Sequence, residues 1–326
     1  MTTITDIALA LGITPSTVSR ALAGNPRVKE ETRLAVLQMA QEMGYERNVV
    51  ASDLRRGLSR FVGIVIPRIN REFFSNCIGG AEKVLEDAGY NVIICQTLES
   101  YQAEIKALKN LKNYRAAAIF LSHAIDAPNG KYVREAIGDT PLIQFDRVFP
   151  DVPGAKIVGA NCEGAYKATS HLIKQGYKRI GALAGYMTSQ AYIERLAGYR
   201  LALEGAGRSF DNNIVFYDTL VRENGYLAAQ KALEAGCDAL YCSGDFTALG
   251  AMDALKEKGV RIPEEFGLVG TANEGFTALT SPTISTLSQH PYEMGQAAAH
   301  AFLDGRTDTQ VIPMELIIRQ SSNKKH

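Results

Sequence analysis

In this 326-residue chain, apolar residues near the N-terminus recur with the spacing of one helix face. Later in the chain they form short continuous runs typical of strands. The first helical face consists of Ile7, Ala8 and Leu11. Thr3 and Asp6 have the spacing of a capping box, in which the hydroxyl and the carboxylate each accept a backbone amide of the first turn. Gly12 is suited to end the helix, so the pattern predicts a helix between Thr3 and Gly12.

A second short helix is predicted directly after this one. Thr14 is a suitable N-cap and Pro15 suits the first helical position. The side chains available to face a core are Val18, Ala21 and Leu22, and those on the outer side are Ser16, Thr17, Ser19 and Arg20. Two helices joined by a short turn with Gly indicate a helix-turn-helix. Short hydroxyls with one guanidinium suit a DNA major groove, although an ordinary solvated helix face has similar residues.

A third helix is expected over residues 30–43, and residues 48–57 form a short, weakly helical and basic stretch. Residues 1–60 contain eight Arg or Lys against six acids, whereas the whole chain has 35 of each. This small excess is too weak to indicate DNA binding by itself. A helix as short as the one at 48–57 is marginal alone in water, so we expect it to depend on a binding partner.

From Phe61 onward, short apolar runs alternate with helical stretches. The predicted strands cover residues 61–66, 91–95, 116–121, 142–145, 157–159, 180–185, 214–217, 239–242 and 268–270. Such runs are typical of buried parallel strands with crossover helices, the doubly wound α/β class. Roughly ten strands favour two sheets over one.

Several classes of protein are disfavoured by what the sequence lacks. No Gly-rich phosphate-binding motif follows a strand, and the five histidines match no zinc-protease or nucleophile pattern, so we expect no enzyme, cofactor or metal site. The five scattered cysteines suggest reduced, buried thiols. No signal stretch precedes the helices and no run approaches the roughly 18 apolar residues of a membrane span. We therefore expect a soluble cytoplasmic protein, associated with the nucleoid and without a membrane partner.

The chain resembles the LacI/GalR family over essentially its whole length. The matching residues stand in the family's order and spacing: Thr17-Val18-Ser19-Arg20-Ala21-Leu22, Val28, Thr32-Arg33, Gly44-Tyr45, Asn48, Ala51 and Leu54. The resemblance implies an all-α helix-turn-helix headpiece at 1–46, a hinge helix at 47–58 and a two-lobed core like periplasmic sugar-binding proteins at 59–326. The first lobe would take about 61–158 and 289–313, and the second about 159–286 and 314–322, with a last strand near 314–319.

The resemblance also implies which residues bind. The expected DNA contacts are Thr14, Pro15, Ser16, Thr17, Ser19, Arg20, Asn48, Ala51, Leu54 and Arg55. Ligands of open α/β sheets lie beyond the carboxyl ends of the strands. The expected effector contacts there are Arg68, Asn70, Phe73, Phe74, Ser122, Asp146, Arg147, Ser189, Arg195, Leu220, Asp245, Phe246 and Asn273. Arg195 is the strongest of these, because the family uses the arginine of this motif to hold the effector.

One departure from the family bears on the effector. Members commonly have an Asp that binds sugar or purine groups where this chain has Ala272. Losing an acid while keeping Arg147 and Arg195 tilts the pocket toward an anion, because guanidinium pairs well with carboxylate or phosphate. The hypothesis is a sugar acid or sugar phosphate, although Asp146, Asp245 and Glu274 keep a neutral sugar open.

The resemblance predicts a transcriptional regulator, by family default the repressor of a carbohydrate-utilisation operon. A homodimer formed through the cores would bind a pseudo-palindromic double-stranded operator, with affinity set by a small-molecule effector. Inducer and corepressor both fit the sequence. The alternatives are a cytoplasmic small-molecule-binding protein without DNA function and, less favoured, an enzyme.

Overall fold

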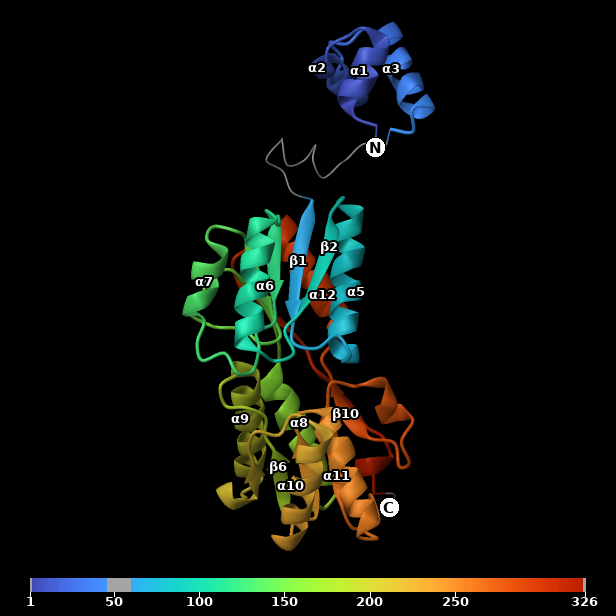
Figure 1. The fold of residues 1–326 in the computed structure, drawn as a ribbon. Helices are drawn as coiled ribbons and strands as arrows, with labels where there is room; N and C mark the ends of the chain where they lie inside the picture. Colours follow the sequence, from blue (N-terminus) through green and yellow to red (C-terminus); the bar gives the residue numbers. More distant parts are fainter. Residues whose placement is uncertain (1, 46–59, 325–326) are drawn as a thin grey trace. The chain divides into compact units, whose positions relative to one another are not determined.

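The structure is a computed structural model that describes residues 2–45 and 60–324. The chain divides into two compact units, residues 1–59 and 60–326. Three helices make up the described part of the first unit: α1 (Ile4–Leu11), α2 (Pro15–Leu22) and α3 (Glu30–Glu42) (Figure 1). Their small core contains Ile7, Ala8, Val18, Ala21, Val36 and Ala40.

Local capping signals place the first two helices where the sequence predicts them. The Thr3 hydroxyl accepts the Asp6 amide while the Asp6 carboxylate accepts the Thr3 amide, and Gly12 ends α1 with a left-handed φ of 64°. The Thr14 hydroxyl accepts the Thr17 amide, and Pro15 occupies the first turn of α2. The predicted helix-turn-helix is therefore present.

The second unit is built on two six-stranded sheets that define two lobes. The first sheet runs, in spatial order, β11 (Thr309–Ile312), β5 (Ala155–Gly159), β4 (Leu142–Phe145), β3 (Ala118–Leu121), β1 (Phe61–Ile66) and β2 (Asn91–Gln96). The second runs β12 (Glu315–Ile317), β10 (Ser285–Ser288), β9 (Gly267–Thr271), β8 (Ala239–Cys242), β6 (Ile180–Leu183) and β7 (Val215–Phe216). The pairings are parallel except for the antiparallel pairing of β12 with β10, which confirms the doubly wound α/β class.

Helices cover both faces of each sheet, as Figure 1 shows. The helices of the first lobe are α5 (Glu72–Asp87), α6 (Tyr101–Asn113), α7 (Lys131–Ile137) and α12 (Pro291–Leu303). Those of the second are α8 (Asn161–Lys174), α9 (Gln190–Gly205), α10 (Arg222–Glu234) and α11 (Asp245–Glu257). Alternate strand residues face opposite layers, so Ile64 packs with α5 and α12 whereas Val65 packs with α6 and α7.

The chain crosses between the lobes three times: after β5, between β10 and α12, and between β11 and β12. The returning helix α12 packs closely against α5 because glycines lie at the contact. A Cβ atom at Gly295 would lie 1.9 Å from the carbonyl oxygen of Cys77. Such a distance excludes any larger residue without a shift of the backbone.

Two strands escape prediction from the sequence. β10 contains mostly hydroxyl residues, and its buried Thr286 and Ser285 are satisfied by bonds to Asp245 and the Arg319 backbone. β11 lies at a sheet edge and is partly exposed. Within the described residues, every helix is too short or too polar to cross a membrane.

Candidate functional site

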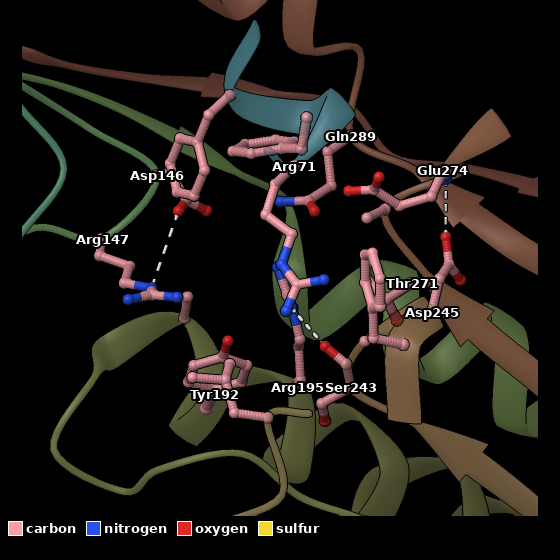
Figure 2. Close-up of a pocket in the computed structure, with 17 residues that line it drawn as sticks. Arg71, Asp146, Arg147, Tyr192, Arg195, Ser243, Asp245, Thr271, Glu274 and Gln289 are labelled. Atoms are coloured by element: carbon pink, nitrogen blue, oxygen red, sulfur yellow. Dashed lines mark hydrogen bonds and ion pairs between the residues drawn. The ribbon is translucent and has the colours of Figure 1, made fainter. Parts of the chain in front are cut away.

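A cavity of about 90 Å³ lies between the two lobes and is lined from both (Figure 2). The first lobe supplies residues around the start of α5 and after β4. The second supplies residues of α9 and those that follow β8 and β9. The cavity therefore lies beyond the carboxyl ends of parallel strands, where ligands of such sheets bind.

Eight of the thirteen expected effector residues line this cavity: Phe73, Phe74, Asp146, Arg147, Arg195, Leu220, Asp245 and Phe246. Asp146 directly follows β4 with a φ of 59°, and Ala272 follows β9 with a φ of 122°. Non-glycine residues rarely adopt such angles, and they concentrate at functional sites.

The other five expected residues do not line the cavity. Ser122 contacts a lining residue instead, since it donates a hydrogen bond of 3.3 Å to Asp146. Asn273 turns its side chain toward Arg319, and Asn70 is exposed. Ser189 is fully buried at the start of α9, and Arg68 lies 4.0 Å from Glu99.

The cavity also contains residues that the sequence-based list omits: Arg71, Tyr192, Ser243, Thr271 and Gln289. Tyr192 precedes Arg195 by three residues and therefore shares its helix face, a signal available from spacing. Gln289 follows β10, a strand that the sequence did not reveal, so its place at a strand end could not be recognised.

Two arginines of the cavity are almost fully buried and lie near one aromatic ring. The Arg147 and Arg195 guanidinium carbons lie 5.8 and 5.3 Å from the Tyr192 ring centroid. Arg147 is paired with the Glu99 carboxylate at 2.7 and 3.3 Å. Arg195 instead donates to two neutral oxygens, the Asn161 side chain at 2.8 Å and the Ser243 carbonyl at 2.9 Å.

The carboxylates of the cavity carry raised pKa values. Burial raises the pKa of Asp245 to about 7, although its carboxylate accepts bonds from the Thr286 hydroxyl and the Glu274 amide. Gly270 makes room for this carboxyl, since a Cβ there would lie 2.1 Å from its oxygen. Burial also raises the pKa of Asp146 and of Glu274. With a pKa of about 7, the Asp245 carboxyl is partly protonated near neutral pH, so the site is less negative than its count of acids suggests.

One edge of the cavity is closed by a reciprocal pair of bonds between the lobes. The Glu72 amide donates to the Glu274 carboxylate at 3.0 Å, and the Gly275 amide donates to the Glu72 carboxylate at 2.6 Å. Beside them the Arg71 guanidinium lies 3.4 Å from the Phe246 ring centroid. Glu274 thus caps the first turn of α5 from the opposite lobe.

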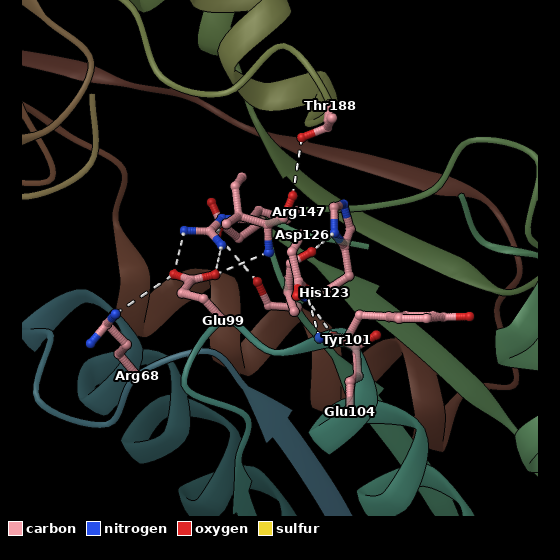
Figure 3. A network of polar contacts seen from close by, with 12 residues as sticks. Arg68, Glu99, Tyr101, Glu104, His123, Asp126, Arg147 and Thr188 are labelled. Carbon is pink, nitrogen blue, oxygen red and sulfur yellow. Dashed lines mark hydrogen bonds and ion pairs between the residues drawn. The ribbon is translucent and has the colours of Figure 1, made fainter. Parts of the chain in front are cut away.

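A polar network at another edge joins the lobes through the loop after β3 (Figure 3). Glu99 accepts the Ile125 amide as well as the Arg147 guanidinium. The Ile125 carbonyl accepts the hydroxyl of Thr188, which comes from the second lobe. The neighbouring Glu104 accepts the Ala124 amide and the Tyr132 hydroxyl, and burial raises its pKa to about 7.

The headpiece presents the outer face of α2 as predicted for a recognition helix. Ser16 and Arg20 are exposed, and Thr17 and Ser19 are partly exposed. Thr14 caps the helix and also bonds the Ser16 hydroxyl. The remaining expected DNA contacts, Asn48, Ala51, Leu54 and Arg55, lie outside the described residues, as does the expected hinge helix.

Comparison with known families matches both units. The family described as bacterial regulatory proteins, lacI family, matches residues 3–48. The family described as periplasmic binding proteins and sugar binding domain of LacI family matches residues 59–318. These matches define the class as a DNA-binding transcription regulator with a binding-protein-like core. The chain belongs to the LacI family, as its sequence resemblance predicts.

Curated relatives match nearly the whole chain. The HTH-type transcriptional repressor PurR of Vibrio atlanticus (strain LGP32) is 29% identical over 306 residues, which cover 93% of this chain and 92% of the relative. The HTH-type transcriptional regulator DegA of Bacillus subtilis (strain 168) is 27% identical over 331 residues, with coverage of 99% and 98%. Both relatives are transcription regulators.

Solved structures share the fold. A lac repressor dimer bound to operator and the anti-inducer ONPF has a TM-score of 0.86 at 22% identity, covering 99% of each chain. A complex of the regulator CelR with cellobiose has a TM-score of 0.74 at 24% identity, covering 98% of this chain and all of the other.

Proposed function

We propose that the protein represses a carbohydrate-utilisation operon and that a small molecule in the cavity between the lobes sets its operator affinity. The observation that carries the proposal is that a single chain contains two distinct candidate binding sites. These are the exposed polar face of α2 and a cavity lined by arginines and acids from both lobes. The similarity to the repressor PurR over nearly its whole length and the cellobiose of the CelR complex support this assignment.

The DNA partner is a pseudo-palindromic double-stranded operator bound by a homodimer in the cytoplasm. A dimer presents two recognition helices related by a two-fold axis, so it binds two half-sites in successive major grooves. The lac repressor dimer on its operator is a precedent for this assembly. Arg20 is the only arginine of α2 and is exposed, so it is the leading contact to a guanine or a phosphate.

The effector acts by shifting a population. The cavity is lined from both lobes, so a bound ligand contacts both and changes the free energy of their closure. It alters operator affinity only as far as its own affinity differs between the two arrangements. Both an inducer and a corepressor act in this way.

Selection of genomic DNA fragments by the purified full-length protein tests the proposal. Wild type enriches a two-fold symmetric sequence, and Arg20→Ala weakens binding to it by roughly tenfold or more because a bidentate base contact is lost. The control Gln38→Ala on α3, which removes only a bond to Glu42, keeps wild-type affinity. A wild-type protein that selects no sequence would favour the alternative, a small-molecule-binding protein without DNA function.

A further inference from the structure

We propose that Arg71, Arg195 and the Gln289 amide form an anion subsite that binds a carboxylate or phosphate group of the effector. The three residues line the same cavity (Figure 2). The inference rests on the proposed function, because it takes the cavity as the effector site, and it adds the chemical class of the ligand.

The arginines of the cavity differ in whether their charge is neutralised. Glu99, which does not line the cavity, holds Arg147 in a two-bond ion pair. Arg195 has only the neutral oxygens of Asn161 and Ser243 as partners. Arg71 makes no side-chain hydrogen bond within residues 2–45 and 60–324 and lies over the Phe246 ring. Among these residues no carboxylate oxygen lies within 4.0 Å of the nitrogens of Arg71 or Arg195.

The carboxylates of the cavity are engaged with other groups. Glu274 accepts the Glu72 amide, and Asp245 accepts the Thr286 hydroxyl and the Glu274 amide. Asp146 accepts the Ser122 hydroxyl and lies 4.0 Å from Arg147. The charge of Glu274 acts on Arg71 and that of Asp146 on Arg195, but among the described residues neither carboxylate pairs with these arginines within 4.0 Å, so an anionic ligand can approach them more closely. A buried cation without a partner is costly, which an anionic ligand relieves.

An independent observation places a further donor at the same cavity. The Gln289 side chain is 3% exposed and interacts with the Asp146 carboxyl, whose pKa it lowers, but its Nε2 atom makes no hydrogen bond within 3.5 Å among the described residues. Buried amide donors are usually satisfied, so a missing partner indicates a ligand acceptor. Guanidinium groups add paired N–H donors that match the oxygens of carboxylate and phosphate.

The positions of the donors explain how such an anion would act. Arg71 precedes α5 in the first lobe, whereas Arg195 lies on α9 in the second. An oxyanion held by both therefore draws the lobes together. A cavity of about 90 Å³ has room for roughly six to nine water-sized groups, which suits a phosphate group or a small hydroxy acid. Asp146 is placed to accept hydroxyl groups of the same ligand.

Calorimetric titration of the full-length protein at constant ionic strength tests the subsite. The probes are inorganic phosphate, gluconate and sorbitol, the neutral counterpart of gluconate. Wild type binds phosphate or gluconate at least tenfold more tightly than sorbitol, and the preferred anion distinguishes a phosphate from a carboxylate subsite. Arg71→Gln and Arg195→Lys each weaken that binding by roughly tenfold or more. Arg71→Gln is the decisive variant because it removes no hydrogen bond that holds the fold.

The matched control is Arg261→Gln, whose arginine pairs with Glu265 at the surface and whose loss leaves anion binding unchanged. The inference is overturned if neither anion binds wild type more tightly than sorbitol, or if Arg71→Gln binds both as wild type does. Sequence-specific DNA binding is measured on the same preparations. If the protein binds anions but no specific DNA sequence, the proposed function is refuted and the subsite is retained. If it binds a specific DNA sequence but shows no preference for anions, only the subsite is refuted.

Discussion

Arg147 from the first lobe and Arg195 from the second form a natural pair for comparison. They are 6% and 5% exposed, and both lie near the Tyr192 ring. The lobes that carry them also match in strand order, reading β2-β1-β3-β4-β5-β11 in one and β7-β6-β8-β9-β10-β12 in the other. Residue type and burial are therefore nearly constant between the two arginines, whereas Arg147 follows strand β4 and Arg195 lies within helix α9.

The partners of the two arginines differ. Arg147 is held by the Glu99 carboxylate, which also fixes the Ile125 amide, so the ion pair belongs to the framework that joins the lobes. Arg195 is held only by the neutral oxygens of Asn161 and Ser243, which orient the guanidinium without neutralising it. The partner of a buried arginine, more than its burial, therefore decides whether its charge is structural or available to a ligand.

Glu99→Gln has the largest expected effect, because it removes the close charge partner of the buried Arg147 and leaves only the Asp146 carboxyl, 4.0 Å away. Removing one member of a buried ion pair is strongly destabilising, and we expect the free energy of unfolding to fall by about 3 kcal/mol. Urea denaturation of the full-length protein measures this loss.

The matched control is Glu163→Gln, which breaks the exposed pair with Lys167 on α8. Surface pairs contribute little, so this change should stay below about 0.5 kcal/mol. Equal losses in the two variants would mean that the Glu99–Arg147 pair is not structural, and the contrast between the arginines would fail.

Asn161→Asp would make the second arginine resemble the first. The new carboxylate lies where the amide oxygen accepts Arg195 at 2.8 Å, so it neutralises the guanidinium in place. We expect anion affinity to fall about tenfold, or about 1.4 kcal/mol, as measured by the same calorimetric titration. Asn161→Gln, which adds no charge, should retain more anion affinity. If the Asp variant binds anions as wild type does, the charge of Arg195 is not what the ligand recognises.

Much of the molecule could be predicted because the deciding signals are local. Thr14 and Pro15 start α2 through bonds made within a few residues, and the buried strands are continuous apolar runs. The same local signals predicted that residues directly after strands, such as Asp146, would line the cavity.

The rest of the site depends on contacts between residues distant in the sequence. Arg71 lines the cavity because the reciprocal bonds between Glu72 and the Glu274–Gly275 segment, more than two hundred residues apart, bring α5 to the second lobe. Arg195 was predicted, but its neutral partners were not, because Asn161 and Ser243 meet it only after the sheet has formed. The sequence therefore suggested the identities of the arginines, and the fold decided which one keeps an available charge.

Asp245→Asn should change the free energy of unfolding only a little near neutral pH, but it should clearly change how that free energy depends on pH. Burial raises the pKa of this carboxyl from 3.8 to about 7. Between pH 4 and 7 the folded protein therefore holds a proton that the unfolded chain releases. The stability contributed by this proton is complete below about pH 4 and is lost as the pH rises through about 7. Glu104, also raised to about 7, adds to the same fall.

The free energy of unfolding, measured by urea denaturation from pH 4 to 8, should fall less steeply with pH in the Asn variant. The surface change Asp253→Asn, which removes only the pairing with Arg222, should keep the wild-type slope. An Asn variant with the wild-type slope would mean that Asp245 is ionised throughout, and the cavity would then be more negative than the anion subsite requires.

Thr188→Val should produce the smallest effect, because it removes one partly buried hydrogen bond at equal side-chain shape. The Thr188 hydroxyl donates to the Ile125 carbonyl at 3.1 Å and connects the second lobe to the loop that the Glu99–Arg147 pair supports. We expect a loss of about 0.5–1 kcal/mol in the free energy of unfolding and faster hydrogen exchange of the Ile125 amide. Thr188→Ser keeps the hydroxyl and should retain most of the protection. If exchange at Ile125 is unchanged in the Val variant, the ion pair holds the loop without help from the second lobe, and Arg147 stabilises only its own lobe.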